Sequence, residues 1–399
     1  MNLNKPKLWT KEFVLISTVN FFLTLVFFLL IVTIAVYAVA EFDATTSEAG
    51  LATGIAIIGT MTGRIIIGRL IEKIGRKRTL IIGLILFVLT TLLYFVNLGL
   101  PFLMTNRFLH GMTLGMASTA AGTIVAQIIP MTRKGEGIGY FSMSSTLATA
   151  IGPFIGLFMS QRTSFEMIFA LCVVFGIISL AFALFVKVPA VDYSVKSDKT
   201  KGFKISDFLE PRALPIALIT FTAALCFSSI LSFINFYAIE IDLVETASFF
   251  FVVYAIAVLI SRPFTGRLMD IRGANFVMYP AFVALAAGLL LLSTATSSLS
   301  FLTAAVLIGF GFGNLQSTTQ AIAVKLTPPH RMGLATSTFF IFLDAGLGFG
   351  PYILGFIIPL TGFSTLYVIL GFTALAASIL YYVLHGKKER AASSAAPIS

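Results

Sequence analysis

Charge is scarce in this sequence, and so are the residues that build metal and disulfide sites. Only 11% of the 399 residues are charged and 58% are hydrophobic, whereas soluble domains carry about 25% charged residues. Both cysteines, Cys172 and Cys226, fall inside apolar stretches, so no structural disulfide is expected. The sequence has three histidines and no nucleotide-binding P-loop. We therefore expect no metal, no cofactor and no enzymatic activity, and we expect an integral membrane protein.

Long apolar windows indicate how this chain crosses the membrane. A helix of about 20 apolar residues spans a hydrocarbon core of about 30 Å. Twelve such windows lie near 13–40, 50–71, 79–97, 101–126, 138–159, 166–186, 213–239, 247–269, 275–293, 300–324, 333–358 and 364–384. The predicted fold class is an all-α membrane protein with twelve transmembrane helices.

Basic residues gather in every second loop between these windows. Residues 73–78 contain four basic side chains, whereas residues 41–48 contain three acidic ones. Such an alternation is the positive-inside pattern, which predicts that both termini and the central loop are cytoplasmic. The net charge of +10 therefore reflects a protein in the cell membrane and is no sign of nucleic-acid binding.

The sequence repeats itself at a constant offset of 198 residues. Small and charged positions of the first half meet the same kinds of residue in the second half. Arg64, Gly68, Glu72, Gly75, Gly152 and Pro153 align with Arg262, Gly266, Asp270, Gly273, Gly350 and Pro351. We predict six-helix bundles at 1–186 and 213–386, a polar cytoplasmic linker at 187–212 and a disordered cytoplasmic tail at 387–399.

One acid stands in the middle of an apolar span. Asp344 lies about 16 Å into the window 333–358 at a rise of 1.5 Å per residue. Gly348, Pro351 and Gly355 follow it at helical spacing, so the acid shares the small-residue face and is expected to point into the protein. Because an ionised acid at this depth costs a few kcal/mol, we interpret Asp344 as a group that binds and releases protons. A carboxyl held permanently by a hydrogen bond or an ion pair is the alternative.

Arg107 is the other charge well inside a span, and it needs a partner, a cavity or an anionic substrate. We assign it to proton coupling with Asp344, as an electrostatic counterweight or an anion contact. Polar side chains in several spans could line a substrate cavity, although helix packing explains the glycines beside them equally well. The cavity candidates are Asn20, His110, Asn235, Tyr254, Asn314, Gln316 and Gln320.

Three motifs of this sequence resemble those of the major facilitator superfamily. The loop from Gly68 to Arg78 resembles its cytoplasmic signature, and Arg107-Phe-Leu-His110-Gly111 resembles its span-four signature. The segment from Thr149 to Gly156 resembles the Gly-Pro motif of exporters that exchange substrate for protons. The resemblance covers essentially the whole chain and implies two bundles that work by alternating access.

The resemblance also implies roles for individual residues. A cytoplasmic gate is expected from Gly68, Glu72, Lys73, Gly75, Arg76, Lys77, Arg262 and Asp270, in which Glu72 pairs with basic groups or with a helix N-terminus. Gly152, Pro153 and Gly156, with Gly350 and Pro351, are expected to form the antiporter motif and its repeat, where proline can kink the helix.

The expected function is proton-coupled export of small amphipathic or drug-like compounds by a monomer. The expected partners are the small-molecule substrate, protons and the lipid bilayer. A dedicated metabolite or metallophore exporter remains an alternative, as does an uptake symporter or facilitator of the same fold. A receptor without transport activity and a lipid flippase have less support from the sequence.

Overall fold

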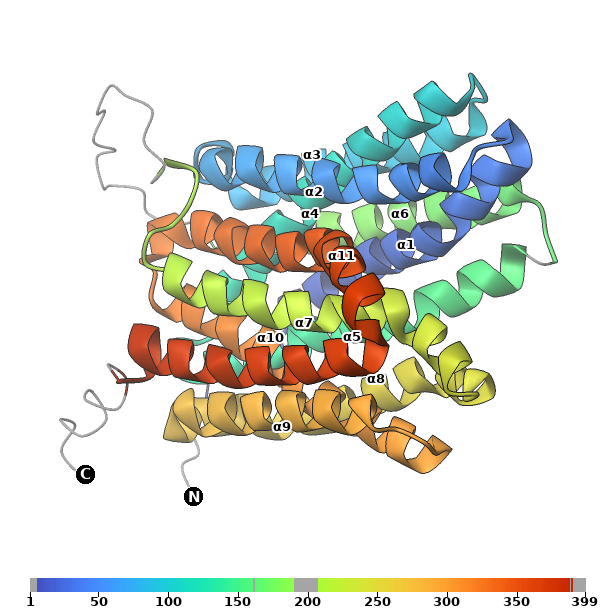
Figure 1. The fold of residues 1–399 in the computed structure, drawn as a ribbon. Coiled ribbons are helices and arrows are strands. Elements are labelled where there is room, and N and C mark those ends of the chain that lie inside the picture. Colours follow the sequence, from blue (N-terminus) through green and yellow to red (C-terminus); the bar gives the residue numbers. More distant parts are fainter. Residues whose placement is uncertain (1–5, 161, 190–206, 388, 390–399) are drawn as a thin grey trace. The chain divides into compact units, whose positions relative to one another are not determined.

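The computed structural model describes residues 6–160, 162–189, 207–387 and 389, which are helical almost throughout and contain no strand (Figure 1). The long helices are Lys11–Phe42 (α1), Thr46–Ile74 (α2), Arg76–Leu92 (α3), Leu100–Ile128 (α4), Lys134–Ser160 (α5), Phe165–Phe185 (α6), Leu214–Glu240 (α7), Val244–Arg272 (α8), Asn275–Ser293 (α9), Ser298–Lys325 (α10) and Met332–Tyr381 (α11). Short helical turns lie at Leu93–Phe95 (η1), Met131–Arg133 (η2), Pro329–Arg331 (η4) and Tyr382–Gly386 (η5). The all-α membrane fold predicted from the sequence is thereby confirmed.

Local sequence signals set where several of these helices begin and end. The Thr45 side chain accepts a hydrogen bond from the Glu48 N–H, and the Glu48 carboxylate accepts one from the Thr45 N–H, which is a capping box at the start of α2. Gly75 and Gly273 end α2 and α8 with φ angles of 95° and 89°. Residues with a side chain rarely adopt such angles, so glycine is required at both repeat-related turns.

The longest helix, α11, contains a break. Gly362 has a φ of 75° and a ψ of 171°, which are not helical values. Ten stretches of the described residues are long and apolar enough to cross a membrane, and the longest, Pro329–Gly386, has 58 residues. A straight helix of that length would extend about 87 Å, almost three times a hydrocarbon core of about 30 Å. The break at Gly362 therefore separates two crossings, and the windows predicted at 333–358 and 364–384 fall on either side of it.

The helix α4 completes the set of predicted spans. It is absent from the ten apolar stretches, and its sequence includes the polar residues Asn106, Arg107 and His110. With α4 and with the two parts of α11 counted separately, each of the twelve predicted windows coincides with a helix of the described chain.

The described residues form two compact units that do not follow the sequence repeats strictly. The first unit takes the described residues up to Pro130, those of Ser144–Glu210, and Thr327–Ile341. The second unit takes Met131–Met143, Pro211–Leu326, and the described residues from Phe342 onward. The start of α11 thus belongs to the first unit, and the start of α5 belongs to the second. The boundaries predicted at 186 and 213 remain a prediction about the sequence repeats.

Glycines bring helix backbones into close contact inside each unit. A Cβ atom added at Gly111 of α4 would lie 2.0 Å from the Ala56 carbonyl oxygen of α2, and one added at Gly63 of α2 would lie 2.1 Å from the Met112 carbonyl oxygen. The repeat-related Gly309 of α10 would place a Cβ 2.7 Å from the Tyr254 carbonyl oxygen of α8. Helix packing is therefore the role that the structure gives to these glycines.

Parts of the predicted linker and tail lie outside the described residues. These parts are residues 190–206 of the linker, and residues 388 and 390–399 of the tail. The predictions of a polar linker at 187–212 and a disordered tail at 387–399 therefore remain predictions there.

Candidate functional site

Asp344 is a partly buried residue of α11. It follows Phe340 by one helical turn and Ser337 by two, so the three residues share one face of the helix. A different face of α11 contacts α7, because a Cβ at Gly346 would lie 2.6 Å from the Phe221 carbonyl oxygen. The acid therefore lies on a face of α11 other than the one packed on α7, and its predicted orientation into the protein remains a prediction.

In the first unit, Glu72 joins α2 to the beginning of α11. Its carboxylate accepts hydrogen bonds from Arg76 Nε at 3.1 Å and from Arg76 Nη2 at 2.7 Å. The same carboxylate accepts from the Gly333 N–H at 3.2 Å. Gly333 lies in the first turn of α11, where free backbone N–H groups and the helix dipole attract a negative charge. Arg76 is further held by Gln127 Oε1 at 2.8 Å.

In the second unit, Asp270 makes the repeat-related contacts with the beginning of α5. Its two carboxylate oxygens accept from the Gly135 N–H at 2.9 Å and the Glu136 N–H at 2.8 Å. Lys325 Nζ lies 2.8 Å from Asp270 Oδ1, so this acid, like Glu72, has a basic side chain as a partner. Each unit thus contains an acid at the end of one helix that caps the start of a helix from the other sequence repeat.

Glycines make these two contacts possible. A Cβ at Gly68 would lie 2.5 Å from Ser337 Oγ, and a Cβ at Gly266 would lie 2.7 Å from the Gly135 carbonyl oxygen. The Ser337 hydroxyl donates to the Arg64 carbonyl oxygen at 2.6 Å. Each acid follows its glycine by four residues, so the close helix contact at the glycine and the charged side chain lie on the same helix face.

The other basic residues of the predicted gate lie around this cluster without joining it. Lys73 is exposed, and Lys77 Nζ donates to the Leu184 carbonyl oxygen at 3.0 Å, which links α3 to the end of α6. Gly75 supplies the left-handed turn described above. Among the predicted gate residues of the first repeat, Gly68, Glu72 and Arg76 are the ones that the structure brings together with α11.

Sequence reasoning missed the burial of two arginines near the ends of α2 and α8. The side chains of Arg64 and Arg262 are both buried. Arg64 Nη1 donates to Ser118 Oγ at 3.1 Å, and its guanidinium lies over the Phe340 ring at 4.4 Å. Arg262 Nη2 donates to the Gly313 carbonyl oxygen at 3.0 Å. The available signal was the repeat itself, because both arginines stand four residues before a contact glycine.

The end of the linker adds a contact that the sequence did not predict. Glu210 forms an ion pair with Arg331, and its carboxylate side chain is only 3% exposed. The Glu210 N–H donates to Thr338 Oγ1 at 2.8 Å, and the Arg69 guanidinium lies over the Phe208 ring at 4.9 Å. Residues 207–210 thereby bind the ends of α2 and α11 within the first unit.

Arg107 lies entirely inside the first unit. Its side chain is 0% exposed, and it donates from Nε to the Ala52 carbonyl oxygen at 3.1 Å and from Nη1 to Tyr94 Oη at 3.2 Å. His110 stacks on Phe87 with ring centroids 4.5 Å apart and lies 3.1 Å from Thr91 Oγ1. Asp344 belongs to the second unit, and the role of Arg107 as an electrostatic counterweight or an anion contact in proton coupling remains a prediction.

Most of the predicted cavity residues take part in helix packing. Asn20 Nδ2 donates to Ser144 Oγ and Ser145 Oγ of α5, both at 2.9 Å. Asn314 Oδ1 accepts from Thr265 Oγ1 at 2.6 Å. Gln320 Oε1 accepts from Ser142 Oγ at 3.4 Å, and Gln316 Oε1 accepts from Arg262 Nη2 at 3.3 Å. Tyr254 is buried and stacks on Phe227, whereas Asn235 is exposed.

The Gly-Pro motif also packs helices together. A Cβ at Gly152 of α5 would lie 3.1 Å from the Leu25 carbonyl oxygen of α1, and a Cβ at Gly156 would lie 2.9 Å from the Leu29 carbonyl oxygen. The repeat-related Gly350 of α11 would place a Cβ 2.0 Å from Ser228 Oγ of α7. Pro153 and Pro351 lie inside α5 and α11. The motif and its repeat therefore pack α5 on α1 and α11 on α7.

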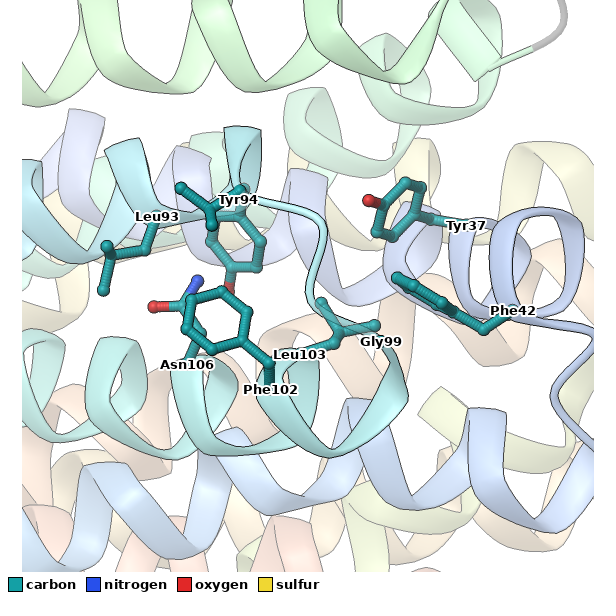
Figure 2. A pocket seen from close by; sticks show the side chains of 9 residues that line it. Tyr37, Phe42, Leu93, Tyr94, Gly99, Phe102, Leu103 and Asn106 are labelled. Atoms are coloured by element: carbon teal, nitrogen blue, oxygen red, sulfur yellow. The ribbon is translucent and has the colours of Figure 1, made fainter.

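A small cavity lies in the first unit where α1, η1 and α4 approach one another (Figure 2). Its volume is about 10 Å³, and it is lined by Tyr37, Phe42, Leu93, Tyr94, Val96, Gly99, Phe102, Leu103 and Asn106. The described residues contain no group of three or more histidines, cysteines and acids that could hold a metal ion.

The sequence profile of the Major Facilitator Superfamily matches residues 16–346 and 244–398. The chain therefore belongs to this superfamily and is a multi-pass membrane transporter of small molecules. The crystal structure of the human organic anion transporter MFSD10 has a TM-score of 0.76 with 13% sequence identity, over 94% of this chain and 100% of that one. At this identity the likeness shows the shared fold.

Three curated relatives have modest identity. An uncharacterized MFS-type transporter of Methanocaldococcus jannaschii is 28% identical over 358 residues, which are 88% of this chain and 92% of that protein. The staphylopine export protein of Staphylococcus aureus is 22% identical over 357 residues, which are 86% of this chain and 88% of that protein. The quinolone resistance protein NorA of Staphylococcus aureus is 28% identical over 195 residues, which are 49% of this chain and 48% of that protein.

Proposed function

We propose that this transporter exports small amphipathic or drug-like compounds in exchange for protons. The observation that carries the proposal is Asp344, a partly buried acid inside an apolar helix. A charged acid at the centre of a membrane helix costs about 2.5–3.5 kcal/mol on insertion scales, so it is stabilised by taking up a proton or by a cationic partner. An acid with these two options can make proton release depend on substrate binding.

The exchange step follows from this competition. Proton and cationic substrate are alternative partners of the Asp344 carboxylate, so binding of one favours release of the other. Arg107 is proposed to act as the electrostatic counterweight. The direction of coupling is export when the site takes substrate from the cytoplasm and protons from outside.

The two acid-capped contacts are proposed to form the cytoplasmic gate. Opening would require that Glu72 releases the Gly333 N–H and that Asp270 releases the Gly135 and Glu136 N–H groups. Each contact includes a charged acceptor, and hydrogen bonds to charged groups are worth about 1.5–3 kcal/mol. Contacts of this size stabilise a closed gate and still allow it to open on a millisecond timescale.

Two substrate classes have support among the relatives. NorA, a quinolone resistance protein, supports drug-like substrates but aligns with about half of this chain. The staphylopine export protein aligns over 86% of the chain, which favours a dedicated metabolite or metallophore exporter as the second candidate. The staphylopine export protein is an exporter by name, and an uptake symporter or facilitator of the same fold is the third candidate. We further propose a monomer in the cell membrane with both termini in the cytoplasm.

The test uses inside-out membrane vesicles that hold an imposed pH gradient, reported by a fluorescent probe. Cationic, neutral and anionic compounds, and a metallophore, are added to wild type and to Asp344→Asn. The matched control is Asp242→Asn, because Asp242 is an exposed acid whose φ of 56° suits asparagine equally well. We expect substrate to collapse the gradient in wild type and in Asp242→Asn but not in Asp344→Asn.

The other outcomes separate the alternatives. An equal response of wild type and Asp344→Asn would refute the role of Asp344 and leave exchange itself in place. Substrate flux without any proton movement would replace exchange with facilitated transport. A response to the metallophore alone would assign the protein to dedicated export.

A further inference from the structure

The cavity between α1, η1 and α4 contains an amide that has no hydrogen-bond partner among the described residues. Asn106 lines the cavity and is 2% exposed. Neither its Nδ2 nor its Oδ1 atom makes a hydrogen bond within the part of the chain that the structure describes. Figure 2 shows the Asn106 amide beside the rings of Tyr94 and Phe102. A buried amide without a hydrogen bond costs free energy, so the amide needs a ligand with both donor and acceptor capacity.

Tyr94 provides a second polar group at the same cavity. Its hydroxyl oxygen accepts from Arg107 Nη1 at 3.2 Å, so its own proton is available for donation. Tyr94 also lines the cavity and is 3% exposed. The Arg107 guanidinium polarises the Tyr94 hydroxyl and makes it a better donor.

The size of the cavity restricts the ligand. A volume of about 10 Å³ is close to the lower limit of about 10–15 Å³ that admits one water molecule. A buried water needs two to four polar partners, and the Asn106 amide and the Tyr94 hydroxyl offer three groups. A larger organic compound does not fit this volume.

We propose that this cavity is a hydration site that holds one ordered water molecule. The water accepts from the Tyr94 hydroxyl and from Asn106 Nδ2, and it donates to Asn106 Oδ1. The result is a hydrogen-bonded chain that runs from Arg107 through Tyr94 and the water to Asn106. The chain stabilises a charged arginine in an apolar bundle, where Arg107 donates to two neutral groups of the described residues, the Ala52 carbonyl oxygen and the Tyr94 hydroxyl.

The test is radiolytic hydroxyl labelling of the full-length protein in lipid nanodiscs, read by mass spectrometry. X-rays convert an ordered internal water into a radical that labels the side chain beside it. Tyr367 is the matched control within the chain, because it is 0% exposed and its hydroxyl has no hydrogen-bond partner among the described residues, yet it does not line this cavity. We expect Tyr94 to be labelled several-fold faster than Tyr367.

A variant tests whether the amide holds the water. Asn106→Leu keeps the size of the side chain and removes both polar atoms, so labelling of Tyr94 should fall to the rate of Tyr367. Equal rates at Tyr94 and Tyr367 in wild type would overturn the proposal, because the cavity would then be dry, and this comparison requires no variant. Unchanged Tyr94 labelling in a folded Asn106→Leu protein would also overturn it, because the water would then not depend on the amide.

Discussion

Replacement of Gly111 by alanine tests the close contact between α2 and α4. The new Cβ would lie 2.0 Å from the Ala56 carbonyl oxygen and 2.8 Å from its carbonyl carbon, whereas real Cβ contacts essentially never fall below 3.0 Å. Because these are backbone atoms, no side chain can rotate away. The helices must separate by about 1.0 Å, which also disturbs the contact of Gly63 with Met112. Overpacking of this kind costs about 1–3 kcal/mol.

Gly54→Ala is the matched control on the same pair of helices. A Cβ at Gly54 of α2 would meet nothing within 4 Å, and alanine in a helix is favoured over glycine by about 0.5–1 kcal/mol. Gly111→Ala should therefore lower the stability, whereas Gly54→Ala should leave it unchanged or raise it. Thermal unfolding in detergent, followed by fluorescence-detected size exclusion, should give a lower apparent midpoint for Gly111→Ala and an unchanged or higher one for Gly54→Ala. Equal midpoints would refute the inferred contact.

Two further predictions concern the contacts of the proposed gate. Glu72→Gln keeps an acceptor but removes the charge, so the hydrogen-exchange rate of the Gly333 amide should rise by about tenfold, which corresponds to about 1.4 kcal/mol. Replacement of the exposed Lys73 by glutamine should leave this rate unchanged. Equal rates in wild type, Glu72→Gln and Lys73→Gln would contradict the capping contact. Glu210→Gln leaves the buried ion pair with Arg331 incomplete, so it should cost about 1–3 kcal/mol of stability and lower the apparent unfolding midpoint. Asp207→Asn should not lower the midpoint. A midpoint of Glu210→Gln equal to that of wild type would show that the linker end contributes nothing to stability.

The two capping acids, Glu72 and Asp270, show how much of the proposed gate the sequence could predict. The family resemblance predicted Gly68 and Glu72 as gate residues, and the repeat pointed to Asp270 as the equivalent acid. No local pattern could identify the Gly333 N–H as a partner of Glu72, because the two residues are 261 positions apart. The predicted kind of partner, a helix N-terminus, is nevertheless the kind that the structure places there.

The polar residues of the membrane spans show what residue spacing could not predict. Helical spacing could not decide whether Asn314 and Gln320 line an open cavity or bind other helices, because both arrangements put a polar group on an inner face. The structure gives each of them a hydrogen-bond partner on a neighbouring helix. Asn106, which the sequence did not single out, has none among the described residues. Whether a buried amide lacks a hydrogen-bond partner depends on the side chains of every neighbouring helix, and the local sequence does not show which helices these are.

The sequence by itself determined the membrane architecture of this transporter, its two repeats and the isolated acid Asp344. These features follow from hydropathy, charge alternation and residue spacing, which can be read along the chain without knowing which helices contact one another. Only the tertiary structure decided that Arg64 and Arg262 are buried, that Glu210 binds Arg331, and that Tyr94 and Asn106 share a cavity. Such features arise from contacts between helices that are distant in the chain, and the geometry of helix packing sets those contacts.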